Sequence, residues 1–275
     1  MARTSFVKFT AILVVVLSLS GFGLCLTKSE LAEFLPYGLP SHDNLRLFGK
    51  YILSYDRRFK VPLWVMEHLK PNMFLPNTSI DRDLNFREDS SLHPYFRSKN
   101  KDYRSTIYDK GHLAPAADFN LDKSSSSESF ILSNIAPQVA SMNRGVWLRL
   151  ENYVRRRAKE SNNTYVVSGP LYMPTETKDG KKYLRLEIIG ESNVAVPTHF
   201  YKVLLTEGKR VRGKPEAIIE AFVIPNSPDI DRQAHIDEYR ITVEELPIYE
   251  QASGLLFFNR IDRTKVKSRK SVKSN

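Results

Sequence analysis

The sequence of 275 residues has a single cysteine, Cys25. One thiol excludes an intrachain disulfide framework and any zinc site built on paired cysteines. A bound metal ion would therefore depend on oxygen or histidine ligands. After residue 28 the sequence has no further stretch apolar enough to span a membrane and no repeat with a period of 20 to 50 residues, which argues against solenoids and propellers. With 12 glycines and 15 prolines the chain is also neither collagen-like nor of low complexity.

Acidic residues are missing from both ends of the chain. Residues 1–28 contain three basic residues and no acid, and residues 263–275 contain six basic residues and no acid. The 234 residues between them contain 32 bases and 31 acids. The formal net charge of +10 thus comes mainly from the ends and is weak support for polyanion binding by the body. We expect residues 263–275 to form a disordered basic tail.

The N-terminal segment has the composition of an address or an anchor. Residues 9–26 are free of charge and follow Arg3 and Lys8. An 18-residue helix of this kind would be about 27 Å long, just enough to cross a bilayer core. A secretory signal peptide has the same layout. We interpret residues 1–28 as a targeting segment or membrane anchor, and the sequence leaves open whether it is cleaved or retained.

The body of the chain, residues 29–262, has the pattern of an α+β domain with an antiparallel sheet and few helices. Residues 50–70 predict a hairpin around a polar turn, and residues 122–129 predict a serine-rich loop. Apolar spacings of three and four predict a long helix near 143–160, and a second, short helix is expected within 243–254. Further strands are predicted over 165–173, 181–190, 198–206 and 216–225.

His112 stands out among the six histidines because of its neighbours. It follows Gly111, which permits close backbone approach, and lies beside Lys110 and Asp109. An imidazole that can deprotonate water, next to positive charge, is what phosphodiester hydrolysis requires. The same residues also fit a merely structural histidine.

Asn143 and Glu151 form a second candidate group on the predicted helix. Eight residues correspond to about 12 Å of helical rise, so the two side chains are too far apart to be easy direct ligands of one ion. One direct oxygen ligand plus a carboxylate that holds water of the ion would suit Mg²⁺. The alternatives are a helix N-cap for Asn143 and a surface ion pair with Arg155 for Glu151.

Two basic stretches could attract phosphate backbones. Residues 144–159 contain six bases and one acid, and residues 97–110 contain five bases and two acids. A solvated basic face would have the same composition.

Several blocks, in order, are similar to the DNA/RNA non-specific endonuclease family. They include YDKGHLAPAADF, FILSNIAPQ, MNRGVWLRLENYVR, TYVVSGPLYMP and VAVPTHFYKVLL, and the resemblance covers residues 35–262. It implies a ββα-metal (His-Me finger) nuclease fold, with a central antiparallel sheet flanked by helices, and cleavage of DNA and RNA that depends on Mg²⁺ or Mn²⁺. It also implies a homodimer and a mitochondrial location, in the intermembrane space or at the inner membrane.

The resemblance assigns roles to individual residues. His112 matches the general base, Asn143 the direct metal ligand, and Glu151 the carboxylate that holds metal-bound water. Arg82 matches the arginine that contacts the reacting phosphate, with Arg87 as the alternative.

Three further residues match the family's substrate-binding part. Asn134 and Gln138 lie in the SNIAPQ block and are expected to support the site. Lys110 stands where the family normally has arginine, so the charge is kept but the two-donor fork is lost. A catalytically weakened protein that binds nucleic acid without cutting it is therefore one alternative, and a secreted nuclease is another.

Overall fold

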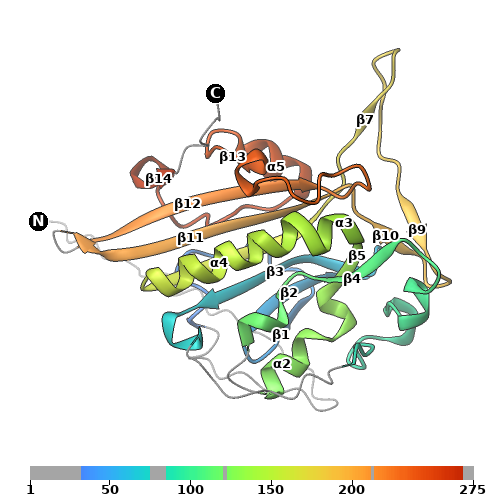
Figure 1. Cartoon of the computed structure of the whole chain (residues 1–275), viewed down its shortest axis with the longest axis horizontal. Coiled ribbons are helices and arrows are strands. Elements are labelled where there is room, and N and C mark those ends of the chain that lie inside the picture. The colour runs from blue at the N-terminus through green and yellow to red at the C-terminus, as the bar shows by residue number, and fades with distance from the viewer. Residues whose placement is uncertain (1–31, 75–84, 120–122, 212–213, 269–275) are drawn as a thin grey trace, which may run out of the picture.

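The computed structural model describes residues 32–74, 85–119, 123–211 and 214–268. The N-terminal segment 1–28 and Arg82 lie outside these ranges. The core is an eight-stranded sheet in the order β1-β2-β3-β6-β11-β12-β13, with β14 also paired to β12 (Figure 1). All pairings are antiparallel except that of β12 with β14. The strands are β1 (Leu45–Leu47), β2 (Tyr51–Asp56), β3 (Val61–Leu69), β6 (Asn163–Leu171), β11 (His199–Val211), β12 (Lys214–Pro225), β13 (Arg240–Ile241) and β14 (Lys267–Ser268).

Alternating side chains of the strands pack on opposite faces of the sheet. In β2, Tyr51 and Leu53 belong to one buried cluster and Ile52 to the other. Because successive strand residues point to opposite faces, this alternation divides the core into two layers. Helix α4 (Leu148–Glu160) covers the first face, and α5 (Leu246–Ser253) packs on the second.

A strand–strand–helix unit lies on the α4 face. β4 (Tyr108–His112) pairs antiparallel with β5 (Ile135–Val139), in a two-stranded sheet of their own. The chain continues from β5 through α3 (Ala140–Met142) and a π-helical turn (Asn143–Trp147) into α4. This order brings the end of β4 beside the start of α4, as Figure 1 shows.

Two helix predictions are confirmed and one loop prediction is wrong. The long helix is present, although it begins with the π-helical turn, and α5 ends at Gly254, whose φ of +70° suits a helix C-terminus. The predicted loop over 122–129 is instead helix α2 (Lys123–Ser129). Ser129 is buried and donates a 2.7 Å hydrogen bond to the carbonyl of Ser126. Tertiary burial thus outweighs the low helix propensity of serine.

The region 181–190 differs from its prediction as one half-buried strand. β7 (Thr175–Glu176) and β8 (Lys182–Tyr183) form an exposed hairpin that projects from the body (Figure 1). β9 (Glu187–Ile189) pairs separately with β10 (Val194–Val196). The segment therefore breaks into two short strands.

The predicted disordered tail does not begin at residue 263. Arg263 starts a short 3-10 helix, and its guanidinium donates to the Glu250 carboxylate, through Nη1 at 3.0 Å. β14 then adds to the edge of the sheet beside β12. Residues 263–268 therefore belong to the folded body, and the rest of the predicted tail lies outside the described residues.

Among the described residues, no helix combines the length and apolar character needed to cross a bilayer.

Candidate active site

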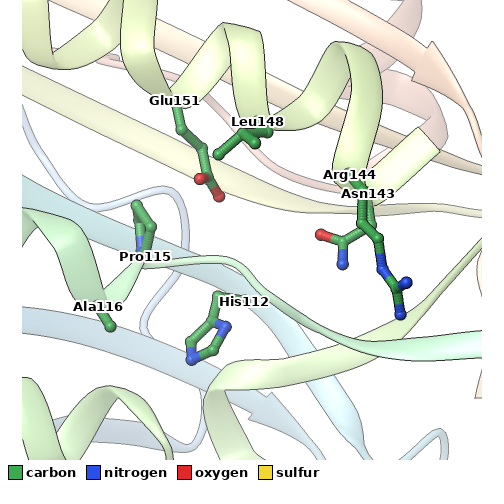
Figure 2. A pocket seen from close by; sticks show the side chains of 7 residues that line it. All are labelled: His112, Pro115, Ala116, Asn143, Arg144, Leu148 and Glu151. Carbon is green, nitrogen blue, oxygen red and sulfur yellow. The ribbon is translucent and has the colours of Figure 1, made fainter. Parts of the chain in front are cut away.

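A pocket of about 230 Å³ opens between the end of β4 and the start of α4. This volume exceeds the roughly 30 Å³ of one water molecule several times, so a hydrated ion fits. Figure 2 shows His112, Pro115 and Ala116 on one side and Asn143, Arg144, Leu148 and Glu151 on the other. The structure therefore brings together the histidine, the asparagine and the glutamate singled out in the sequence.

His112 is the last residue of β4 and lies in an aromatic setting. The ring centroids of Phe86 and Phe130 are 5.2 Å and 4.8 Å from its own. Its Nε2 is buried without a hydrogen-bond partner among the described residues. Burial lowers the pKa of His112 to about 4, because desolvation disfavours the charged imidazolium. The ring is therefore neutral at pH 7, the form in which it can accept a proton.

Asn143 is held by Asp109 from the facing strand. Its Nδ2 donates a 2.9 Å hydrogen bond to Oδ2 of Asp109. Arg144 binds the same carboxylate through Nε at 2.8 Å and Nη2 at 2.6 Å. With the amide nitrogen occupied, the side-chain oxygen of Asn143 faces the side of the pocket where His112 and Glu151 lie (Figure 2). The N-cap interpretation of Asn143 is wrong, because the residue ends α3 with helical φ and ψ of −58° and −50°, and its side-chain amide binds Asp109.

Gly145 lets the start of the helix approach a neighbouring loop. A Cβ atom at this position would lie 2.8 Å from the carbonyl oxygen of Arg232. The φ and ψ of Gly145, −108° and −110°, depart from helical values and mark a kink. This kink separates Asn143 from the regular helix that carries Glu151.

Glu151 lies in the first turn of α4 and is buried. Burial raises the pKa of Glu151 to about 7, while the positive charges of Lys202 and Arg155 act in the opposite direction. The surface ion pair with Arg155 is not formed, because the Arg155 guanidinium binds Asp118 at 2.8 Å instead. Glu151 is thus available to the pocket.

The donor atoms of this pocket suit a hard cation that keeps much of its water. The described residues contain no group of three or more His, Cys, Asp or Glu side chains arranged to hold a metal ion. The pocket offers one amide oxygen, from Asn143, and one carboxylate, from Glu151. Mg²⁺ accepts oxygen ligands and retains several waters, so these residues fit it, whereas a zinc site would need more protein ligands.

Lys110 is not among the residues that line the pocket. Its Nζ donates a 3.0 Å hydrogen bond to Oδ1 of Asn100 and lies 4.8 Å from the centroid of the Phe86 ring. Phe86 also contacts His112, so the lysine and the histidine share one aromatic neighbour. The Arg87 guanidinium is bound to the carbonyl and hydroxyl oxygens of Ser127, at 2.7 and 2.9 Å.

Asn134 and Gln138 are placed in the interior, which differs from their prediction as substrate-binding residues. Asn134 has no exposed surface and bonds to the backbone of Ala114 and Ser129. Gln138 is equally buried and lies where the Cβ of any residue replacing Gly111 would need to be. Neither side chain can reach substrate in this conformation, so both support the loop and strand around His112.

Half of the six basic residues of 144–159 are paired with acids that lie far away in the sequence. Arg144 is paired with Asp109, Arg155 with Asp118, and Arg157 with Glu220. The excess of positive charge counted along 144–159 is therefore much smaller in the folded protein.

Comparison with known proteins identifies the family. The sequence model of the DNA/RNA non-specific endonuclease family matches residues 32–264. The chain belongs to this family.

Relatives of known structure and function extend this result. The nuclease is 40% identical to human mitochondrial endonuclease G over 229 residues, which is 83% of this chain and 74% of the relative. It is 37% identical to the human mitochondrial nuclease EXOG, over 86% of this chain and 63% of the relative. The fold matches a chain from the crystal structure of an EndoG/EndoGI complex with a TM-score of 0.82 and 41% identity, covering 89% of this chain and 97% of the other. The predicted ββα-metal nuclease fold is thereby confirmed.

Sequence reasoning missed three neighbours of the site. Phe86 contacts His112, Asn100 contacts Lys110 ten residues away, and Lys202 contacts Leu113 across 89 residues. The sequence offered one signal for these neighbours, which is the lysine at position 202 within a largely apolar predicted strand.

Proposed function

We propose that this nuclease hydrolyses phosphodiester bonds of both DNA and RNA with the aid of a divalent metal ion. The observation that carries the proposal is the single pocket lined by His112, Asn143 and Glu151. A neutral imidazole, an oriented amide oxygen and a carboxylate are what metal-assisted hydrolysis by water requires.

In this mechanism His112 accepts a proton from water, and the resulting nucleophile attacks phosphorus in line with the leaving 3′ oxygen. The products would carry 5′ phosphates. Asn143 would hold Mg²⁺ or Mn²⁺ directly, and Glu151 would hold its water. When bound, the ion would supply positive charge at the phosphate. Asp109 fixes the Asn143 amide and takes no part in proton transfer.

Lys110 and Arg82 are the residues we assign to the phosphate. Lys110 does not line the pocket in this conformation, and its ammonium, held by Asn100, would act on a phosphate as a point charge without the paired geometry of arginine. We therefore expect a nuclease of altered strength rather than an inactive one.

The proposed location follows the names of the relatives, and the proposed homodimer follows the family resemblance. The two human relatives are named as mitochondrial proteins. We propose that residues 1–28 direct this chain to mitochondria, at the intermembrane space or the inner membrane, and that it acts as a homodimer. The segment could remain in the membrane after import.

Replacement of the proposed base tests the function. His112→Ala should lower the rate of Mg²⁺-dependent plasmid nicking by about 10²- to 10⁴-fold, the usual contribution of a general base. His42→Ala, at an exposed histidine, is the matched control and should cut like the wild type. A wild-type protein that binds nucleic acid and does not cut it with Mg²⁺ or Mn²⁺ would identify a pseudonuclease instead.

A further inference from the structure

A buried cluster of charged side chains lies under the active-site pocket and has no part in the mechanism above. Lys202, on β11, is 1% exposed, and Glu67, on β3, and Asp118 are buried to the same extent. Burial of a charge is costly unless the charge is partnered, and apolar side chains would fill the same space more cheaply. The cluster therefore calls for a reason beyond packing.

The strand register places Lys202 on the face of the sheet that carries α4. Its neighbours on β11, Phe200 and Leu204, belong to the core cluster under that helix, whereas Tyr201 and Val203 belong to the opposite cluster. A side chain at 202 therefore points toward the catalytic layer.

The ammonium group of Lys202 contacts both halves of the site. It donates to the hydroxyl of Ser168 at 2.6 Å and to the backbone carbonyl of Leu113 at 3.3 Å. Leu113 directly follows His112. The same ammonium lies 4.9 Å from the ring centroid of Trp147, which precedes α4.

Trp147 also contacts the backbone of the proposed general base, His112. Its Nε1 donates a 3.3 Å hydrogen bond to the carbonyl of His112. Lys202 and Trp147 thus hold two consecutive carbonyls, those of Leu113 and His112, from beneath. These two contacts join the His112–Leu113 backbone to strand β11 and to the residue before α4.

Acidic side chains surround Lys202. Asp118 is paired with Arg155, and Lys202 faces Glu67, Asp118 and Glu151. Burial, with the neighbouring Asp118, raises the pKa of Glu67 well above its usual range.

We propose that Lys202 is a positioning residue of this nuclease, whose ammonium fixes the His112–Leu113 backbone against the start of helix α4. The inference rests on the proposed role of His112 as the base. Loss of the ammonium should leave substrate binding intact and misplace the reacting groups. Misplacement of about 1 Å can reduce a rate by about 100-fold.

The test compares Lys202→Met, which keeps an unbranched side chain as far as Cε and removes the ammonium, with Val203→Ala, its equally buried neighbour on the other face. In full-length protein that is folded by circular dichroism, Lys202→Met should lower kcat for plasmid cleavage by about 100-fold and change KM by less than about threefold. It should also shift the His112 signals in spectra of ¹⁵N-histidine-labelled protein. Val203→Ala should lower Tm and leave both kcat and the His112 signals unchanged.

A kcat of Lys202→Met within about threefold of wild type, or an equal loss in Val203→Ala, would overturn the proposal. If Lys202→Met does not fold, Ser168→Ala is the second variant, because it removes the 2.6 Å hydrogen bond of the ammonium. Ser168→Ala should lower kcat by about tenfold. An unchanged kcat in Ser168→Ala would also overturn the proposal. His112→Ala is measured alongside. Activity retained in that variant would refute the assignment of the base, a failure distinguishable from that of Lys202.

Discussion

The carboxylate of Asp109 decides which end of the Asn143 amide faces the pocket. Because it accepts a hydrogen bond from Nδ2, the amide oxygen is left for the metal. Asp109→Asn can present its own NH₂ group and lets the Asn143 amide turn over. We expect activity to fall by about 10- to 100-fold, as for other residues that orient metal ligands, with half-maximal activity at a higher Mg²⁺ concentration.

Asp179→Asn is the control for this prediction, since Asp179 is an exposed acid paired with Lys181 in the projecting hairpin. Its Mg²⁺ dependence should match the wild type. An Asp109→Asn enzyme with unaltered Mg²⁺ dependence would mean that Asn143 is oriented by something else.

The buried imidazole of His112 makes stability depend on pH. Its folded-state pKa of about 4 lies below the value of about 6.5 expected when unfolded, so the unfolded chain binds the extra proton first. Its contribution to stability is therefore constant above pH 7 and is lost as pH falls from about 6.5 toward 4. His112→Gln lacks this titration. Urea titrations give the free energy of unfolding of each protein. The value for wild type minus that for His112→Gln should decrease as pH falls from about 6.5 toward 4.

That difference would stay flat across the window if His112 were solvated in the folded protein. His68 and His199 also have pKa values lowered by burial, and they titrate equally in both proteins, so their contribution cancels.

Helix α4 is fixed to the sheet by a buried charge network rather than by apolar contacts alone. Glu220 on β12 binds Arg157 of the helix at 3.0 Å and Arg240 of β13 at 2.7 Å, and Tyr153 donates a short hydrogen bond to it. Glu220→Gln leaves two buried guanidinium groups without their shared anion. Breaking a buried pair in this way should cost about 3 kcal/mol of unfolding free energy, measured by urea denaturation.

Glu160→Gln tests the specificity of that effect. Glu160 is exposed and lies 3.6 Å from the same Arg157, so its removal should change stability by less than about 1 kcal/mol. Equal losses in the two variants would show that burial of the pair is not what matters.

The elements that the sequence predicts well are those with strong local signals. Runs rich in apolar and β-branched residues identify β2, β3, β11 and β12, and apolar spacing identifies α4. Helix α2 was predicted as a loop, because serine prefers caps and turns and only tertiary burial makes it helical here. Strand β8 of the projecting hairpin was merged with β9 in the prediction of one strand over 181–190, because the alternating residues of this segment resemble a sheet edge.

The site also contains some residues that the sequence predicts and others that it does not. Spacing and family resemblance single out His112, Asn143 and Glu151, and the fold brings all three to one pocket. The supporting contact of Lys202 could not be predicted, because it joins Lys202 to Leu113, 89 residues apart. The basic helix was overestimated for the same reason, since its partner acids come from distant segments.

At the scale of the whole molecule, we propose that the chain combines a targeting segment with a catalytic body. The family match begins at residue 32, after the charge-free run of residues 9–26. We expect cleavage to depend only on the body and delivery only on the leader. Purified residues 29–275 should nick plasmid DNA at the rate of the full chain, within about twofold, because the proposed catalytic residues all lie beyond residue 28.

In cells, the full chain with a fluorescent protein at its C-terminus should reach mitochondria, while the same fusion without residues 1–28 should stay outside them. The uncharged run supplies the apolar surface that import or membrane insertion uses, and the nearly neutral body has no comparable segment among its described residues. Fractionation and N-terminal sequencing of the recovered protein measure both location and cleavage. Recovery of the fusion from the medium would make it a secreted nuclease, with the active-site assignment unchanged because His112, Asn143 and Glu151 lie outside the leader.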